Sequence, residues 1–247
     1  MAAKVHVGTM GWSYDFWTDN FYSRDLAPES FLSEYAKHFD TVEVDNTFYR
    51  IPSKDTVAKW RDHTPANFLF SAKFPRRITH EKMLRDSVET ANVFLERTSL
   101  LGDKLGPLLL QFPYAFKPEH MGLLRDFLST LPKPRRFVVE VRNKKLLQEE
   151  LYSLLRDNRT ALAMVEQPFM PTTEVVTSDF VYIRLEGDRR KVKGILGKVE
   201  VDRADDIKRW AEKIKKLLDL PTDVFVYFSK FYSGYPPADA KQLLELL

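Results

Sequence analysis

The sequence contains no cysteine. This absence excludes disulfide bonds, thiolate nucleophiles, iron–sulfur clusters and cysteine-ligated zinc sites. No stretch approaches the roughly 18 uninterrupted apolar residues of a membrane-spanning helix. The first residues run directly into an apparent strand, without the apolar segment of a signal peptide. Because disulfides persist mainly in oxidising compartments, these absences favour a cytoplasmic protein that does not enter a membrane.

A strong excess of charge of one sign is also missing. The 38 Lys and Arg residues against 35 Asp and Glu residues leave a net charge of +3, so a nucleic-acid partner would have to be held by local clusters of charge. The five histidines show no paired metal-ligand spacing, and the common nucleotide-binding and hydrolase motifs are absent. The sequence thus predicts no zinc site and indicates no particular cofactor. An oxygen-ligated Mg²⁺ or Mn²⁺ site at Glu43, Asp45 or Glu140 stays open, because hard cations prefer oxygen ligands.

Short apolar segments rich in Val, Phe, Leu and Ile recur along the chain and alternate with helical patterns. Several are almost continuously apolar, as at 108–110, which is typical of parallel strands covered on both faces. The predicted strands are Lys4–Gly8, Thr41–Val44, Phe68–Lys73, Gly106–Gln111, Phe137–Val141, Thr160–Val165, Phe180–Leu185 and Val224–Phe228.

Helical patterns fill the intervals, and several begin at the Ser, Thr or Pro residues that are frequent at helix N-termini. The predicted helices are Pro28–His38, a helix capped by Ser53 that includes Val57, Trp60 and Arg61, Glu81–Leu100, Pro118–Leu128, Lys144–Asp157, Asp205–Leu218 and Ala238–Leu247. Eight strand–helix units without a break in composition predict an α/β fold of the (β/α)₈ TIM barrel type. In this fold a closed parallel sheet is surrounded by helices, and residues 1–247 would form one domain. The alternative is an open α/β sheet.

Nearly every predicted strand ends in a polar or charged side chain. In a barrel of parallel strands the C-terminal strand ends meet at one rim, where active sites are built. Polar groups gathered there are costly to desolvate unless they pair with one another or with a ligand. The alternative to a ligand site is an internal ring of salt bridges, for example Glu43 with Lys73 and Glu140 with Arg142. The strand-end residues are Gly8, Thr9, Glu43, Asp45, Asn46, Lys73, Gln111, Glu140, Arg142, Glu166, Arg184, Glu186, Tyr227 and Ser229.

The loops after the predicted strands are crowded with aromatic residues. Such faces can stack on sugars or bases, but a loop this rich in aromatics can instead bury them in a small core of its own. The first loop holds Trp12, Tyr14, Phe16, Trp17, Phe21 and Tyr22.

A basic run, Arg189-Arg190-Lys191-Val192-Lys193, follows the seventh predicted strand. Barrels that bind phosphate often do so with the loops after strands seven and eight. The run therefore predicts either an anion site or mobile, solvated charge.

The strand-end residues fall within short motifs spread along the chain. These motifs include Gly11-Trp12-Ser13-Tyr14, Glu43-Val44-Asp45-Asn46-Thr47-Phe48-Tyr49, Ser71-Ala72-Lys73-Phe74-Pro75, Gln111-Phe112-Pro113, Glu140-Val141-Arg142 and Tyr182-Ile183-Arg184. In this order, over essentially the whole chain, they resemble the YecE-like proteins, known as domain-of-unknown-function family 72. The resemblance implies a TIM-type barrel of unassigned function with a shared cleft at the rim. Two positions depart from the family pattern. Glu186 stands where the family commonly has a His, and Ser229-Lys230 stands where it commonly has an Asn pair. The ligand bound by the seventh and eighth strand–helix units therefore stays open.

The first functional hypothesis is an enzyme acting on a small polar anion or a sugar phosphate at the rim. Glu43 and Glu140 are the candidate acid and base, since carboxylates in unequal environments take opposite roles. Lys73 would either lower the pKa of a neighbouring carboxylate or, if desolvated, act as an amine nucleophile. The predicted substrate-binding residues are Trp12, Tyr14, Asn46, Tyr49, Gln111, Arg142, Arg184 and Tyr227.

The alternative is a nucleic-acid-binding or processing protein. Its loop aromatics would stack on bases while the basic loop follows the phosphates. A non-catalytic binding or scaffold role is a third reading. The sequence specifies neither the substrate nor the reaction, and it leaves the oligomeric state open.

Overall fold

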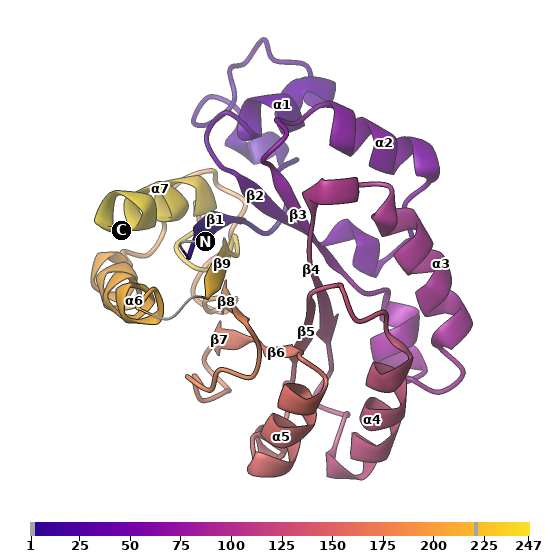
Figure 1. The fold of residues 1–247 in the computed structure, drawn as a ribbon. Helices are drawn as coiled ribbons and strands as arrows, with labels where there is room; N and C mark the ends of the chain where they lie inside the picture. The colour runs from indigo at the N-terminus through magenta and orange to yellow at the C-terminus, as the bar shows by residue number, and fades with distance from the viewer. Residues whose placement is uncertain (1–2, 220–221) are drawn as a thin grey trace.

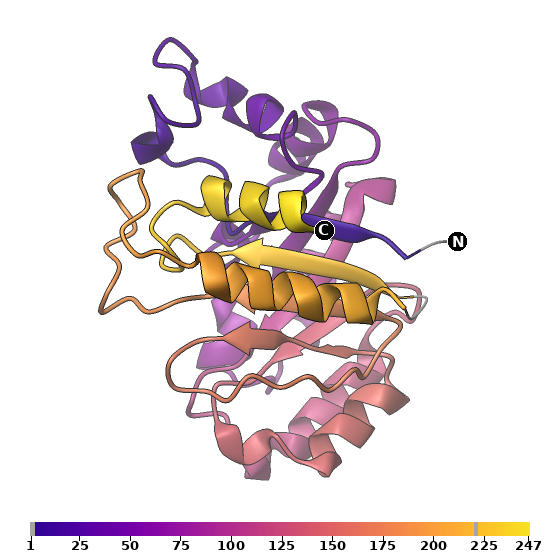
Figure 2. The same ribbon diagram turned by 90° about the vertical axis from the view of Figure 1, so that its left-hand side faces the viewer.

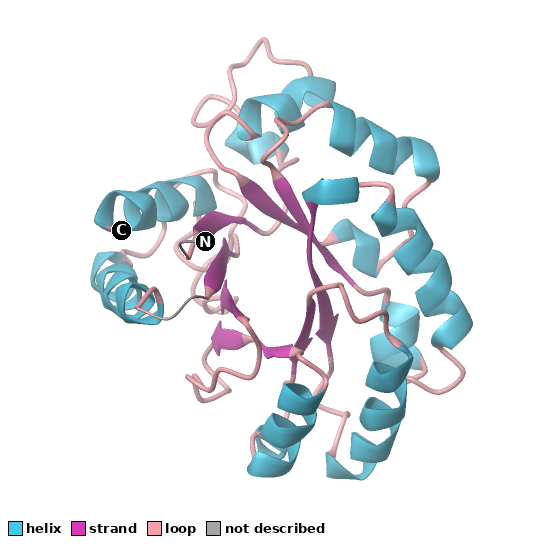
Figure 3. Ribbon diagram, in the orientation of Figure 1, coloured by secondary structure: helices cyan, strands magenta, loops and turns pink. Residues whose placement is uncertain are grey.

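The computed structural model describes residues 3–219 and 222–247. It has an α/β fold with parallel strand pairing in two sheets, one with the order β1-β9-β8-β7 and the other with the order β2-β3-β4-β5-β6. The strands surround a common centre, and the helices lie outside them (Figures 1 and 3).

The strands follow the prediction closely, with ends that differ by one residue at most. They are β1 (Val5–Thr9), β2 (Thr41–Val44), β3 (Leu69–Lys73), β4 (Leu105–Gln111), β5 (Phe137–Glu140), β6 (Ala161–Leu162), β7 (Met164–Glu166), β8 (Phe180–Leu185) and β9 (Asp223–Phe228). The predicted sixth strand is divided at Ala163. Its first half, β6, pairs with β5 and its second half, β7, pairs with β8, so the chain passes there from one sheet to the other.

The two sheets also approach each other where β1 lies beside β2. Met10 and Glu43 form an isolated parallel bridge, and the backbone N–H of Gly11 donates to the Glu43 carbonyl at 2.8 Å. Glycine at position 8 permits this approach, because a Cβ there would lie 2.1 Å from the Thr41 carbonyl oxygen.

The α-helices form the outer layer. They are α1 (Phe31–Tyr35), α2 (Lys54–Asp62), α3 (Val88–Ser99), α4 (Met121–Thr130), α5 (Glu149–Asp157), α6 (Ala204–Leu217) and α7 (Pro236–Leu246). Helix α7 packs against β1 and β9, and α6 lies beside α7 (Figure 2). None of the described helices is long and apolar enough to cross a membrane.

The predicted helix Glu81–Leu100 is wrong in its first part. Residues 77–81 form a π-helical turn, and α3 begins only at Val88. Between them Met83, Leu84 and Asp86 have φ values of 45°, 74° and 45°, which no right-handed helix contains. Burial of the Leu84 side chain and a 2.8 Å hydrogen bond from its N–H to the Ile78 carbonyl favour this turn over a longer helix.

The sixth of the eight predicted strand–helix units has no helix among its described residues, and the sequence had shown no helical pattern in this interval. Residues 167–179, all of which the structure describes, form a loop between β7 and β8 (Figure 3). This segment has a low helix propensity, because it contains Pro168 and Pro171 and five β-branched residues between 172 and 177.

Apolar side chains are divided between a large core under the helices and a small cluster between the sheets. In β4, Leu108 and Leu110 belong to the large core, whereas Leu109 belongs to the small cluster. This alternation follows from the period of two along a strand. It means that Gln111, two residues after Leu109, shares the inward face.

Candidate active site

The inward faces of the strands change from apolar to polar toward their C-terminal ends. The Tyr227 hydroxyl hydrogen bonds with Thr41 Oγ1 at 2.7 Å, and the Tyr182 hydroxyl lies 2.6 Å from Ser71 Oγ. One step further along the same faces come the charged residues. These are Glu43, Lys73, Gln111, Glu140 and Arg184.

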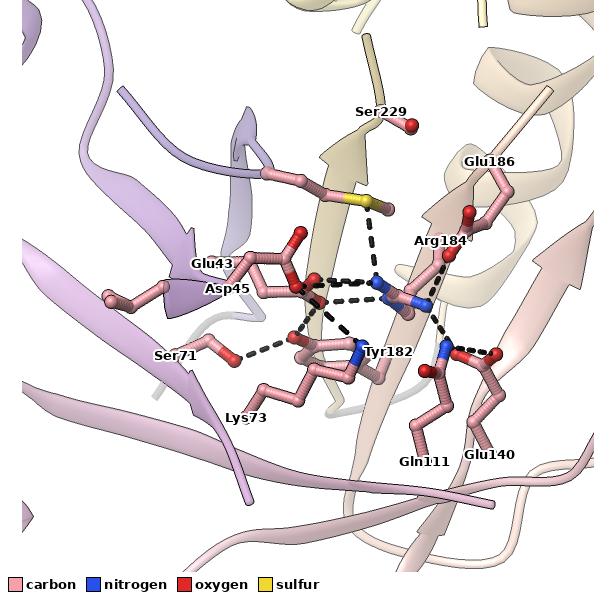
Figure 4. Close-up of polar contacts among 12 residues, drawn as sticks. Glu43, Asp45, Ser71, Lys73, Gln111, Glu140, Tyr182, Arg184, Glu186 and Ser229 are labelled. Atoms are coloured by element: carbon pink, nitrogen blue, oxygen red, sulfur yellow. Dashed lines mark hydrogen bonds and ion pairs between the residues drawn. The ribbon is translucent and has the colours of Figure 1, made fainter. Parts of the chain in front are cut away.

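Arg184 lies at the centre of this polar layer (Figure 4). Its guanidinium, which is 1% exposed, donates to both oxygens of Glu43, from Nε at 2.9 Å and from Nη2 at 2.7 Å. Its Nη1 donates to Glu140 Oε2 and to Glu186 Oε1, both at 2.5 Å. Burial opposes the charge, but these three carboxylates outweigh it and raise the pKa of Arg184 well above its ordinary value. The ion cluster is thus a fixed part of the fold.

Glu43 is fully buried below the opening of the site. Burial raises the pKa of Glu43, and the charge of Arg184 opposes this rise. The Tyr182 hydroxyl donates to Glu43 Oε2 at 2.5 Å and keeps its own proton, because burial and the neighbouring carboxylate raise the pKa of Tyr182. Both oxygens of Glu43 are therefore engaged by protein donors.

Glu140 is equally buried but has the opposite electrostatic balance. Burial acts to raise its pKa, but Arg184, Arg142 and Lys73 outweigh burial, and the pKa of Glu140 falls to about 2. Gln111 Nε2 and Arg142 Nε donate to Glu140 Oε1 at 2.7 and 3.1 Å. Glu140 is thus held in its ionised form, and its oxygens are also engaged by protein donors.

A cavity of about 560 Å³ lies above the ion cluster. Its wall carries six cationic side chains and two acidic ones, so its surface favours an anion. The lining residues are Met10, Tyr14, Asp45, Phe48, Tyr49, Lys73, Arg76, His80, Gln111, Arg142, Arg184, Glu186, Arg189, Ser229, Lys230 and Phe231.

Lys73 is the most enclosed of the lysines that line this cavity. It is 8% exposed, its Nζ lies 4.3 Å from the centre of the Phe48 ring, and Asp45 Oδ1 is 3.9 Å away. Burial lowers the pKa of Lys73, with a contribution from Arg184, while Asp45 opposes the shift. Asp45 Oδ1 is itself buried and has no hydrogen-bond partner in the described part of the chain. The site thus holds a desolvated amine beside a carboxylate oxygen that is free to accept a proton or a hydrogen bond.

His80 borders the same cavity from the π-helical turn. Burial and the charges of Lys73, Arg142 and Arg76 lower the pKa of His80 to about 4. Its ring packs against Phe48 with centroids 4.9 Å apart. His80 is therefore neutral near pH 7 and can donate or accept a hydrogen bond.

Not all predicted site residues reach the cavity. Trp12 packs edge-on against Trp60, Asn46 is exposed outside the cavity wall, and Tyr227 is buried beneath the ion cluster. Glu43 and Glu140 belong to the ion cluster itself and do not line the cavity. The predicted residues that line the cavity are Tyr14, Tyr49, Lys73, Gln111, Arg142 and Arg184.

The alternative of an internal salt-bridge ring is correct in part. Glu140 pairs with Arg142 as expected, but Glu43 pairs with Arg184 rather than Lys73. Among the described residues no group of three His, Asp or Glu side chains is arranged to hold a metal ion. Arg184 instead lies between Glu43 and Glu140.

The first loop buries most of its aromatic residues. Trp17 and Tyr22 are at most 1% exposed, and Tyr14, Phe16 and Phe21 pack against the core. This outcome matches the alternative of a small aromatic core. Tyr49 and Tyr114, by contrast, are 79% and 70% exposed.

The basic run is divided in its roles. Arg189 lines the cavity, Arg190 pairs with Asp188 at 2.8 Å, and Lys191 and Lys193 are exposed. Lys230, in the loop after β9, joins Arg189 on the cavity wall.

Sequence reasoning did not select several residues that the structure places here. Tyr182 could have been found from its position two residues before Arg184, on the same face of the strand. Arg76 and His80 could not, because the turn that presents them was predicted as the approach to a helix. The sequence had placed Asp45, Glu186 and Ser229 at strand ends and Arg189 in the basic run, although none was among the predicted catalytic or substrate-binding residues. The other lining residues are Met10, Phe48, Lys230 and Phe231.

Curated relatives with similar sequences carry the description UPF0759. YecE from Escherichia coli K12 is 36% identical over 139 residues, which are 56% of this chain and 48% of YecE. The chain thus matches about half the length of that relative. YunF from Bacillus subtilis 168 is 24% identical over 98% of this chain and 94% of YunF.

Crystal structures of two other relatives share the fold. A DUF72 family protein from Thermotoga maritima is 26% identical, with a TM-score of 0.83 over 98% of both chains. A DUF72 family protein from Enterococcus faecalis is 23% identical, with a TM-score of 0.80 over 99% of this chain and 97% of that one. The model of the family described as "Protein of unknown function DUF72" matches residues 6–247. The chain therefore belongs to the DUF72 family, as its motifs had indicated.

Proposed function

We propose that the two sheets form one closed TIM-type barrel and that residues 1–247 are a single domain. Two junctions support closure. The first is the bridge and hydrogen bond between the end of β1 and Glu43, and the second is the continuous segment 161–166, which pairs with β5 and then with β8. In such a barrel the cavity lies at the C-terminal rim, where barrel enzymes have their active sites.

We further propose that the chain is an enzyme acting on a small anionic molecule, such as a sugar phosphate, in this cavity. The observation that carries the proposal is the enclosed amine of Lys73 on a wall with six cationic side chains. Buried lysines are almost always paired, whereas this Nζ makes no hydrogen bond to the described residues and has its nearest carboxylate oxygen 3.9 Å away. A lowered pKa in a cleft with nearby charged partners is typical of functional sites.

The geometry supports distinct roles for the predicted residues. Lys73 and Asp45 are the groups with free reactive atoms, so we assign acid/base or nucleophilic chemistry to them. Glu43 and Glu140, predicted as acid and base, have their oxygens bonded to Arg184, Tyr182, Gln111 and Arg142, so we assign them positioning roles. Arg189 would bind the anion, because a guanidinium can bind phosphate in bidentate fashion, and Lys230 would add a second positive charge. Arg142 would contribute mainly its charge, since its Nε and Nη2 already donate to Glu140 and Glu186.

The test is a thermal-stability screen against phosphorylated and carboxylated metabolites at low salt. A ligand at 100 times its Kd stabilises the folded state by about 2.7 kcal/mol. Arg189→Gln should weaken the binding of a detected ligand about tenfold, as expected for loss of one charged hydrogen bond. Arg190→Gln is the matched control, because Arg190 is the next residue but pairs with Asp188. Unchanged melting with every anion, or equal Kd values for both variants, would contradict the proposal.

Nucleic-acid binding is the second candidate, favoured by the exposed aromatic rings of Tyr49, which lines the cationic cavity, and of Tyr114. Exposed aromatic rings can stack on unpaired bases. Fluorescence anisotropy with single-stranded DNA would then show a Kd that rises steeply with salt. The absence of binding at low salt would eliminate this candidate.

A further inference from the structure

Lys73 differs from the other cationic residues of the cavity in its surroundings, because it is enclosed, as Arg184 is, but makes none of the carboxylate hydrogen bonds that Arg184 makes. The side chains of Arg142 and Arg189 are 32% and 66% exposed, whereas that of Lys73 is 10% exposed. The nearest carboxylate oxygen is Asp45 Oδ1, at 3.9 Å, which is too far for a hydrogen bond. The amine is thus enclosed by an aromatic ring and a distant carboxylate, without a hydrogen bond to any described residue.

The surroundings of Lys73 favour nucleophilic chemistry. A neutral amine attacks carbonyl carbon, and desolvation or a neighbouring cation increases its neutral fraction. Both conditions hold here, because burial lowers the pKa of Lys73 and the charge of Arg184 adds to this effect. The Nζ also faces the cavity, so a ligand can reach it.

Asp45 supplies the proton transfer that such an attack requires. Its Oδ1 lies 3.9 Å from Lys73 Nζ and 4.0 Å from Arg184 Nη2, and it has no hydrogen-bond partner among the described residues. The carboxylate can therefore accept a proton from the attacking amine and return it to the departing oxygen.

We propose that the substrate is an anionic carbonyl compound and that Lys73 forms an imine with it. This inference rests on the proposed function and specifies its substrate class. Nζ attacks the carbonyl carbon, a proton moves from nitrogen to oxygen, and the resulting carbinolamine loses water. The carbon–oxygen double bond is replaced by a carbon–nitrogen double bond. Overall, the Lys73 ammonium and the carbonyl compound give a protonated imine and one water molecule, so charge and atoms balance without an oxidant or reductant.

The cations of the cavity determine which carbonyl compounds fit. Arg142, Arg189 and Lys230 line the same space and attract an anionic group while the carbonyl faces Lys73. A cavity of about 560 Å³ accommodates a phosphorylated open-chain sugar. A keto acid would satisfy the same charges with a carboxylate, so the experiment includes both anions.

The experiment traps the imine by reduction. The full chain is incubated with dihydroxyacetone phosphate and sodium borohydride, and the adduct is located by peptide mass spectrometry. Dihydroxyacetone is the matched neutral probe, since it has the same carbonyl group without the phosphate, and pyruvate tests a carboxylate. We expect a stable adduct on Lys73 with at least one anionic probe and at least tenfold less with the neutral probe. Labelling spread over exposed lysines, or none, would overturn the inference.

Two matched variants test the role of the amine. Lys73→Arg and Lys104→Arg each keep the positive charge and remove a primary amine whose pKa burial lowers, but only Lys73 lines the cavity. Lys73→Arg should abolish the trapped adduct, and Lys104→Arg should leave it unchanged. If Lys73→Arg fails to fold, peptide mapping of the unaltered chain still decides the site of attachment.

Failure of this inference is distinguishable from failure of the proposed function. Binding of dihydroxyacetone phosphate that Arg189→Gln weakens, without an adduct on Lys73, would refute the imine and leave the anion site intact. No binding of any anion would refute both.

Discussion

Arg184→Met is the most informative single substitution, because it removes the cation that three buried carboxylates share. Glu43, Glu140 and Glu186 are 0%, 1% and 6% exposed. Removing one partner of a buried ion pair typically costs about 3–5 kcal/mol, since the remaining charge is left without compensation. For a chain of this size that loss lowers the melting temperature by roughly 6–20 °C.

The loss should depend on pH in a defined direction. Without Arg184, burial raises the pKa of Glu43 and Glu140 above their unfolded values, so the folded variant binds more protons than the unfolded chain. Stability that depends on such raised pKa values is present at low pH and is lost as the pH rises. The variant should therefore recover part of its lost stability between pH 7 and pH 5.

Urea unfolding followed by circular dichroism at both pH values measures this effect. Arg24→Met is the matched control, because Arg24 binds Asp19 through the same two-point geometry, at 3.0 and 2.6 Å, but on the surface. It should leave the free energy of unfolding unchanged, since exposed ion pairs contribute little. If Arg184→Met were as stable as the unaltered chain at pH 7, or less stable at pH 5 than at pH 7, the assignment of a buried, charged cluster would be wrong.

Two further predictions concern His80 and Gly187. His80 should titrate near pH 4 when followed by NMR. Because its folded pKa lies below the unfolded value, the stability that His80 contributes is present above pH 6.5 and is lost as the pH falls through about 4. Lys73→Met should raise the pKa of His80, and titration near pH 6.5 in the unaltered chain would refute the assignment. Gly187→Ala should destabilise the fold by at least about 2 kcal/mol in urea unfolding, because Gly187 has a φ of +70° and a Cβ would lie 2.0 Å from the Phe231 carbonyl oxygen. Gly122→Ala in α4, where a Cβ meets nothing within 4 Å, should instead stabilise the fold by about 0.5–1 kcal/mol, and equal effects at both positions would contradict this reasoning.

The sequence predicted the strands well because their signal is local. A run such as Phe180–Leu185 is apolar enough to be recognised as a buried strand, and its last residues identify the end that carries Arg184. The same reasoning placed Lys73 and Gln111 at one edge of the sheets, and both line the cavity. The family motifs were also readable from the residues alone.

Other features depended on contacts that no local pattern records. The segment 81–87 has a helical pattern, but burial of Leu84 turns the chain and brings His80 to the cavity. Ala163 interrupts a strand because the two halves pair with different sheets.

The sequence by itself determined which residues lie at the strand ends, because side-chain alternation has a fixed period. Only the tertiary structure decided which charges meet. Glu43 pairs with Arg184 across the space between the sheets, rather than with Lys73, because the guanidinium can bind both carboxylate oxygens at once. This choice satisfies Glu43 and leaves the amine of Lys73 facing the cavity. Such pairings depend on the stagger between neighbouring strands and on the length of each side chain in three dimensions. The residue pattern of a single strand does not determine either of them.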